Sequence, residues 1–175
     1  MTAHPQGVTM VAGTAGWWVL LAYRVPRVPS TPRIAIWRKL RSLGVAQIGD
    51  GLVALPEDAR TREQLEWVAA DVDAAGGSAT LWRAEMLSAR DEQLLVTQLQ
   101  QARAEEYRSL LTEAEQLGAD PVTDRARTLT RLRRELRRIR RRDYFPPPEE
   151  ELARYAVESL AGRTGQPIRV EGAPA

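Results

Sequence analysis

The residues of this chain that could do chemistry are mostly arginines, and they are concentrated in one run near its C-terminal end. The run TRLRRELRRIRRRD, from Thr130 to Asp143, contains eight arginines in fourteen residues. Four apolar residues recur in and beside it at intervals of three, four and three: Leu129, Leu132, Leu136 and Ile139. This spacing predicts a helix that buries one apolar stripe and exposes a dense array of guanidinium groups.

Such an array is typical of a surface that binds phosphate groups. Glu135 is the only acidic residue from Arg131 to Arg141, and like charges three and four positions apart weaken a helix unless an anion offsets them. We expect the DNA backbone to be contacted by Arg127, Arg131, Arg133, Arg134, Arg137, Arg138, Arg140, Arg141 and Arg142. A phosphate-contacting ladder is expected within this set, formed by Arg131, Arg134, Arg138 and Arg141. The alternative is a solvated face whose arginine stems cover the apolar stripe.

The charge of the chain is distributed unevenly. The formal net charge is only +2, whereas residues 123–143 hold ten arginines against three acidic residues. The remainder is therefore mildly acidic, an asymmetry expected of a protein that offers one basic element to an anionic partner. Lys39 is the single lysine beside 24 arginines, so codon usage that favours arginine also contributes to the count.

Composition argues against most catalytic chemistry. The chain has no cysteine, which excludes disulfides, zinc–thiolate sites and thiol redox sensing. Its only histidine, His4, lies near the N-terminus, where a catalytic group is not expected. The acidic residues Glu66, Asp71 and Asp73 have no strict one-face arrangement with further ligands on their helix, and they are interpreted as solvated surface. We therefore predict that the protein is not an enzyme and has no catalytic residue, metal site or cofactor.

A second basic cluster, formed by Arg24, Arg27 and Arg33, surrounds the expected start of a helix at Thr31 and Pro32. A helix N-terminus favours anions, yet Arg33 places a cation in the first turn. A bound oxyanion such as chromate, sulfate or phosphate would reconcile the two. The interpretation that the sequence favours is simpler, namely exposed loop arginines that pair with surplus carboxylates.

Apolar runs and turn residues predict the elements. Strands are expected at Trp17–Tyr23, Val45–Ile48, Leu52–Leu55 and Ala79–Ala84. The second and third strands are joined by a turn at Gly49–Gly51, and an amphipathic helix follows each of the first and third strands. This order predicts an α+β fold: a ferredoxin-like β-α-β-β-α-β core whose four-stranded antiparallel sheet carries both helices on one face. All five tryptophans are expected in the core.

The C-terminal half is expected to be helical. A long helix from Ser88 to Leu117, capped by Ser88, precedes the arginine-rich helix, which Thr123 or Asp124 caps and Pro146 ends. A short acidic helix follows. The expected organisation is a flexible leader (1–16), a ferredoxin-like domain (17–87), a helical region (88–162) and an irregular tail (163–175). The apolar long helix and the open sheet face together predict a homodimer.

The chain is expected to be cytoplasmic and without a membrane anchor. Gly7 to Tyr23 carries no charge, but it is shorter than the roughly 20 residues that span a bilayer and is interrupted by glycines. No basic region precedes it.

Several blocks resemble the N-terminal domain of the chromate resistance regulator ChrB. They are WWVLLAYRVPRVPSTPRIAIWRKLRSLG, TREQLEWVAADVDAAGGSATLWRAE, EEYRSLLTEAE and RRDYFPPP, and the resemblance extends from about Trp17 to Leu160. It implies a regulator that binds the promoter of a chromate-resistance operon and is released by chromate. It also implies a relation to the ferredoxin-like domain of PaaX-type repressors and of the small CRISPR adaptation endonuclease. The first strand ends Leu21-Ala22-Tyr23-Arg24, without the aspartate of that endonuclease, so no nuclease site is implied. The resemblance also implies that full-length relatives carry a further C-terminal domain.

The sequence as a whole therefore favours a DNA-binding transcriptional regulator of the ChrB type. The alternative, from a different class, is a non-catalytic scaffold that docks a separate partner domain or an acidic protein through its sheet and its arginine-rich helix.

Overall fold

The computed structural model describes residues 16–119 and 125–164, which form two compact units that divide between Gln100 and Gln101. The expected helix cap at Thr123 or Asp124, the leader before Gly16 and the tail from residue 165 lie outside the described residues. Each unit is considered by itself below.

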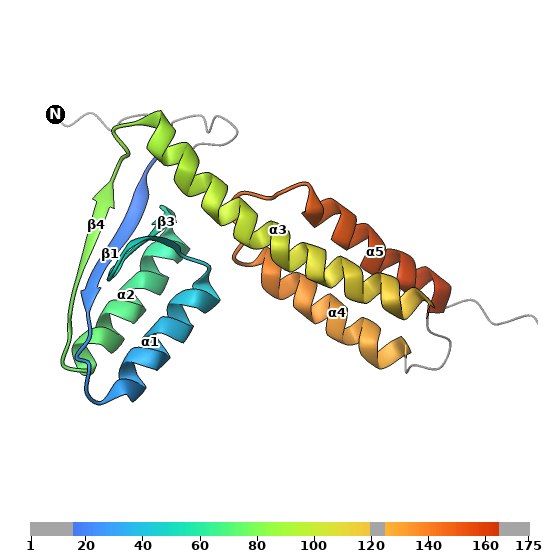
Figure 1. Ribbon diagram of the computed structural model, residues 1–175, viewed down its shortest axis with the longest axis horizontal. Helices are drawn as coiled ribbons and strands as arrows, with labels where there is room; N and C mark the ends of the chain where they lie inside the picture. Colours follow the sequence, from blue (N-terminus) through green and yellow to red (C-terminus); the bar gives the residue numbers. More distant parts are fainter. Residues whose placement is uncertain (1–15, 120–124, 165–175) are drawn as a thin grey trace, which may run out of the picture. The chain divides into compact units, whose positions relative to one another are not determined.

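The first unit has the element order that the sequence predicts (Figure 1). The elements are β1 (Trp18–Arg24), α1 (Ser30–Leu43), β2 (Ala46–Gly49), β3 (Leu52–Pro56), α2 (Ala59–Ala74) and β4 (Ser78–Ala84). The strands form one sheet in the order β2-β3-β1-β4, and every pair in it is antiparallel. Both helices lie on the same side of the strands in Figure 1. The α+β class and the antiparallel four-stranded sheet are thus confirmed.

The central strand β1 is buried on both faces. Trp18 and Val19 point to opposite faces of the sheet because they are neighbours in a strand, and they are 0% and 3% exposed. α2 packs on β1 and β4 and buries Leu65, Val68 and Val72, which are spaced three and four residues apart. The continuous apolar run around β1 therefore predicted its burial correctly.

Two details of the first unit differ from the expectation. Only Trp18 is a core tryptophan, because Trp17, Trp37, Trp67 and Trp82 are 39%, 49%, 63% and 59% exposed. Trp67 and Trp82 lie at positions of α2 and β4 that face away from the packed interior, and the rings of Trp17 and Trp37 are covered by arginine side chains instead. The start of α1 also differs. The helix begins at Ser30, after Pro29, with no side-chain cap, so Thr31 lies inside the helix and does not cap it.

The predicted turn between β2 and β3 depends on Gly51. This residue has φ +72°, and a Cβ there would lie 2.3 Å from the carbonyl oxygen of Tyr23 at the end of β1. The Tyr23 N–H donates to the Gly51 carbonyl oxygen at 2.7 Å. The hairpin tip therefore approaches β1 at a distance that only glycine permits.

Gly51→Ala is expected to lower the free energy of unfolding of the first unit by about 2 kcal/mol, because it combines left-handed backbone strain with a backbone clash. Urea unfolding followed by tryptophan fluorescence measures this, since all five tryptophans belong to the first unit. Gly49→Ala is the matched control, because its Cβ would meet nothing within 4 Å and its φ is not positive. Equal effects of the two substitutions would contradict the close approach.

The helical elements are α3 (Ala89–Ala119), α4 (Arg125–Arg140) and α5 (Glu149–Thr164), and α3 continues from the first unit into the second. Ser88 caps α3 as predicted, since its hydroxyl accepts the Asp91 N–H at 3.4 Å. α4 ends at Arg140, six residues before the prolines expected to end it. The residues after Arg140 form a turn, in which Arg142 pairs with Glu106 of α3 and Asp143 accepts a hydrogen bond from Tyr107 of α3.

The second unit is organised around one core shared by α3, α4 and α5 (Figure 1). Its buried residues are Tyr107, Leu110, Ala114, Leu117, Leu129, Leu132, Leu136, Ile139, Ala153, Val157 and Leu160. The predicted apolar stripe of the arginine-rich helix is fully contained in this list, with every member 8% exposed or less. That prediction is confirmed.

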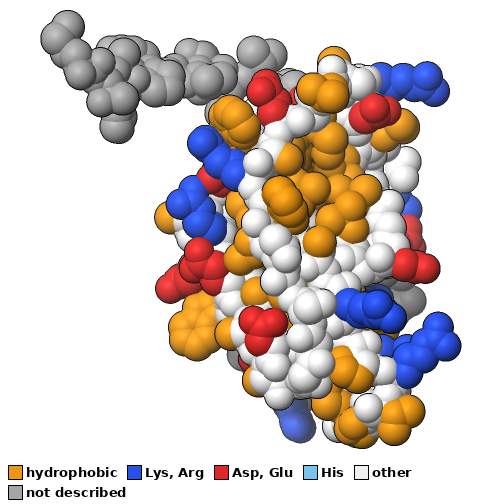
Figure 2. All heavy atoms as spheres, turned by 90° about the vertical axis from the view of Figure 1, so that its left-hand side faces the viewer, with side chains coloured by type: hydrophobic (Ala, Val, Ile, Leu, Met, Phe, Trp, Pro, Cys, Tyr) orange, Lys and Arg blue, Asp and Glu red, His pale blue; other side chains and the backbone are white. Residues whose placement is uncertain are grey.

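Apolar surface remains exposed on the first unit. Figure 2 shows hydrophobic side chains gathered on the side of this unit that faces left in Figure 1, and Trp82 of β4 and Leu94 are about 60% exposed. The apolar residues of α3 that helped to predict a homodimer are mostly buried within the single chain, among them Val96, Leu99 and Leu110. The homodimer stays a prediction with weaker support. Within the described ranges, no helix is both long and apolar enough to cross a membrane.

Candidate functional site

The arginines of α4 are placed by the stripe that the helix buries. In a helix of 3.6 residues per turn, Arg134 lies opposite the stripe of Leu129, Leu132, Leu136 and Ile139. Arg137 and Arg133 follow on one side of Arg134, and Arg131 and Arg138 lie on the other. All these arginines are exposed, whereas Arg142, beyond the end of the helix, is half-buried. A rigid apolar seam thus holds the basic face toward solvent.

Several of the predicted DNA-contacting arginines are already engaged within the second unit. Arg131 pairs with Glu113 of α3 at 2.7 Å, and Arg140 pairs with Glu150 of α5 at 3.0 Å. Arg138 pairs with Glu135 one turn away at 2.5 Å, and Arg142 pairs with Glu106. Arg127 and Arg141 also interact with other groups. The predicted ladder therefore includes two cations, Arg131 and Arg138, that carboxylates partly neutralise.

Three neighbouring arginines differ from the others. Arg133, Arg134 and Arg137 are exposed and form no ion pair with any residue that the structure describes. We call these three residues the outer triplet. They lie within about 100° of arc on the helix surface, and Arg137 is three positions from Arg134 and four from Arg133, so that their like charges repel one another. An anionic partner would relieve this repulsion.

A polar network fixes the turn after α4. The Tyr107 hydroxyl donates to Asp143 Oδ2 at 2.8 Å, and Arg103 pairs with Glu106 at 3.3 Å. Burial raises the pKa of Asp143, while the Tyr107 hydrogen bond and the charge of Arg103 act in the opposite direction. Burial also lowers the pKa of Arg103 and raises that of Tyr107. The network ties the end of the basic helix to α3.

Tyr107→Phe is expected to lower the free energy of unfolding of the second unit by about 1–3 kcal/mol at neutral pH, because half-buried Asp143 loses its hydrogen-bond donor. A raised folded-state pKa means that Asp143 favours folding below its unfolded pKa of about 4, and that this contribution is lost as pH rises through the folded value. Because the substitution raises this pKa further, its cost should be smaller near pH 4 than at pH 7.

Urea unfolding followed by circular dichroism at several pH values measures this effect. Tyr155→Phe is the control, because Tyr155 is 71% exposed on α5. A pH-independent cost of Tyr107→Phe would argue against the Asp143 linkage.

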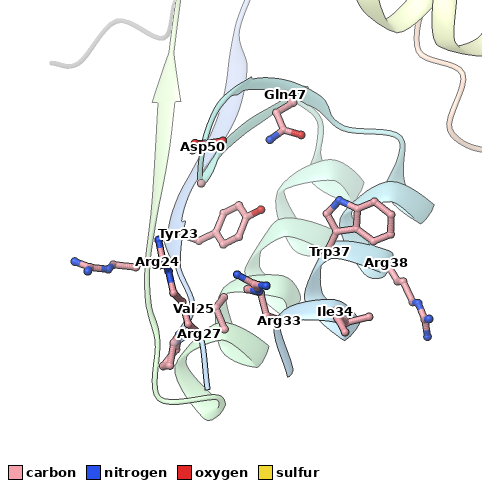
Figure 3. Close-up of a pocket in the computed structure, with 12 residues that line it drawn as sticks. Tyr23, Arg24, Val25, Arg27, Arg33, Ile34, Trp37, Arg38, Gln47 and Asp50 are labelled. Carbon is pink, nitrogen blue, oxygen red and sulfur yellow. The ribbon is translucent and has the colours of Figure 1, made fainter. Parts of the chain in front are cut away.

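The structure brings the second predicted cluster together. Arg24, Arg27 and Arg33 line one cavity of about 750 Å³ in the first unit, between the end of β1, the start of α1 and the β2–β3 hairpin (Figure 3). Arg38, Tyr23, Ile34 and Trp37 line it as well, with Asp50 as its acidic residue. Burial and the nearby charge of Asp50 raise the pKa of Tyr23, so its hydroxyl stays protonated near neutral pH.

Sequence reasoning missed the non-basic part of this cavity. Arg33 and Trp37 are four residues apart on α1, and so are Ile34 and Arg38. These two pairs occupy adjoining faces of the helix, a signal that could have been read as a combined aromatic and basic surface. Elsewhere, within the described ranges, no three histidine, cysteine, aspartate or glutamate side chains are grouped so as to hold a metal ion.

Comparison with known proteins places this arrangement in a family. The sequence pattern of the family described as Protein ChrB, N-terminal, matches residues 33–166. The chain belongs to the ChrB N-terminal family. The match includes most of α1 and the whole of every later element from β2 to α5, so the ChrB resemblance expected from the sequence is confirmed.

Sequence identity to one longer protein shows how far the similarity extends. Protein ChrB of Cupriavidus metallidurans strain CH34 is 29% identical to this chain over 133 residues, which cover 74% of the chain. The chain spans only 40% of that ChrB protein's length. No solved structure matches the chain. The activity of the whole ChrB protein is therefore assigned to this chain only as a proposal.

Proposed function

We propose that this ChrB-type chain is a non-catalytic DNA-binding regulator whose outer triplet contacts the phosphate backbone. The observation that carries the proposal is that Arg133, Arg134 and Arg137 are exposed and have no ion-pair partner among the described residues, on a helix whose opposite apolar stripe is buried. Guanidinium groups held in this way gain contacts with phosphates without giving up existing ion pairs.

Family membership supports the regulatory part of the proposal. The ChrB N-terminal family matches the region that contains α4. The resemblance described from the sequence implies control of a chromate-resistance operon. We propose a chromate response on this basis alone. Base-specific contacts are not part of the proposal, because phosphate contacts position a protein on DNA without reading its sequence.

Duplex DNA binding measured by fluorescence anisotropy over a range of salt concentrations tests this function. One duplex should come from the chain's own upstream DNA, and a second of equal length should be unrelated. Three phosphate contacts predict a slope of log affinity against log salt of about −3 or steeper. A slope near zero, or no binding at low salt, would refute the proposal.

The chromate response is tested by a separate experiment. Chromate and sulfate are compared at constant ionic strength with the upstream duplex. Selective release by chromate supports sensing by this chain. Equal release by sulfate indicates simple competition at the arginines and removes chromate sensing from the proposal.

A scaffold that docks an acidic protein is the second candidate. Arg131 pairs with Glu113 and Arg140 pairs with Glu150, so arginines of α4 bind carboxylates within the chain itself. Competition with poly-glutamate discriminates between the candidates. If poly-glutamate displaces duplex DNA at equal charge concentration, the scaffold role is favoured, because phosphate recognition should prefer DNA.

A further inference from the structure

The cavity of the first unit is much larger than an inorganic oxyanion. A tetrahedral oxyanion has five heavy atoms and occupies on the order of 100 Å³ or less, the space of a few water molecules. The cavity measures about 750 Å³, which lies in the range of sites for organic ligands and cofactors. A bare chromate or sulfate ion would leave most of it filled with water.

The lining of this cavity combines two chemistries. Tyr23, Ile34 and Trp37 provide an aromatic and apolar wall, and Trp37 remains 49% exposed although the Arg41 guanidinium lies 4.8 Å from its ring centre. Four arginines against the carboxylate of Asp50 give the lining a net positive charge: Arg24, Arg27, Arg33 and Arg38. None of the four forms an ion pair with any part of the chain that the structure describes.

Figure 3 shows how these side chains are arranged. The Tyr23 ring extends from β1 toward α1, and Arg33 and Trp37 come from successive turns of α1 on the other side of the space. Arg38 and Arg24 extend outward, away from the centre. The central contacts are therefore offered by two aromatic rings and Arg33, while the outer arginines raise the positive potential around the opening.

We propose that this cavity binds an aromatic organic anion about the size of a mononucleotide, with its ring against Trp37 and Tyr23 and its phosphate or carboxylate group at Arg33. A neutral aromatic compound would leave the repulsion among the arginines uncompensated. An anion without a ring would leave the aromatic wall in water. A ligand with both an aromatic ring and an anionic group contacts the aromatic wall and the arginines at once, because ring stacking and charge-assisted hydrogen bonds then act together.

The proposal does not depend on DNA binding by α4, and small probes test it directly. Isothermal titration calorimetry at fixed ionic strength compares AMP and 1-naphthyl phosphate with adenosine, ribose 5-phosphate, inorganic phosphate and chromate. At least one of the two aromatic phosphates should bind about tenfold more tightly than every probe that lacks either the ring or the charge.

Variants locate the binding site. Trp37→Leu and Arg33→Gln should each weaken binding of the aromatic phosphate about tenfold, whereas Trp37→Phe should retain most of the affinity because it keeps a ring. Trp67→Leu and Arg90→Gln are the matched controls, since both residues are exposed outside the cavity, and they should leave binding of the aromatic phosphate unchanged. Arg133→Gln reports any binding of the probe at α4. Circular dichroism confirms that each variant is folded.

Three outcomes would overturn the proposal. Inorganic phosphate or chromate that binds as tightly as the aromatic phosphates would make this an inorganic oxyanion site. If Arg133→Gln abolished binding while Arg33→Gln left it unchanged, the binding site would lie on α4 and not in the cavity. Absence of heat with both aromatic phosphates up to about 10 mM would leave the cavity without this ligand class.

Discussion

Replacing Arg133, Arg134 and Arg137 together with glutamine is expected to weaken duplex DNA binding on the order of 100-fold near 0.1 M salt. Each lost phosphate contact should also reduce the slope of log affinity against log salt by about 0.9, so the slope should flatten by roughly two to three units. Glutamine keeps helix propensity and removes only the charge. The fold should persist, and relief of like-charge repulsion should leave stability unchanged or slightly higher. Anisotropy titrations and thermal melts measure the two effects.

A second triple variant provides a control with the same change in net charge. Arg131, Arg138 and Arg140 already pair with Glu113, Glu135 and Glu150, respectively. Their replacement by glutamine should flatten the salt slope by less than about one unit, because these cations are partly neutralised on the protein. If both triple variants lose the same affinity, net charge alone determines binding. The outer triplet would then have no special role.

Leu132→Ala is expected to produce the largest loss of stability, about 3–4 kcal/mol of unfolding free energy in the second unit. Leu132 is 0% exposed and lies in the core that α3, α4 and α5 share. Truncation removes buried apolar surface and leaves a cavity, a combination that costs about 2–5 kcal/mol at buried leucines. Because the apolar stripe holds α4 in place, DNA binding should weaken as the second unit unfolds.

The measurement separates the two units by their probes. Circular dichroism at 222 nm reports the helices, while tryptophan fluorescence reports only the first unit, which contains every tryptophan. Leu132→Ala should shift the former transition and leave the latter nearly unchanged. Leu152→Ala on α5, where the side chain is 57% exposed, should cost less than about 1 kcal/mol. A small effect of Leu132→Ala would contradict its central place in the core.

Local patterns in the sequence were sufficient to predict several parts of the structure. The three-four-three spacing of Leu129, Leu132, Leu136 and Ile139 predicted both the helix and its buried face, because helical periodicity depends only on neighbouring residues. The glycine at the β2–β3 turn and the serine before α3 were predicted for the same reason, since turn and cap geometry is decided within a few residues.

The pairing and exposure of individual side chains could not be obtained in this way. The sequence indicated a ladder of four arginines. In the structure Glu113 of α3 pairs with Arg131, whereas Arg134 has no ion-pair partner in the described part of the chain. Trp37 and Trp67 were expected in the core because they lie at core-like positions of predicted helices, yet both remain exposed. Hydrophobic character predicts a tendency toward burial, whereas the packing of other elements decides which ring is covered.

By itself, then, the sequence determined the order of the elements, the buried stripe of α4 and the basic character of its exposed face, since each of these follows from local spacing and composition. Only the tertiary structure decided which arginines remain unpaired, and only it joined Arg33 and Trp37 of α1 to Tyr23 of β1 around one cavity. The physical reason is that contacts between residues distant in the chain are fixed by how helices and sheet pack, and no local pattern encodes the distance between two such side chains.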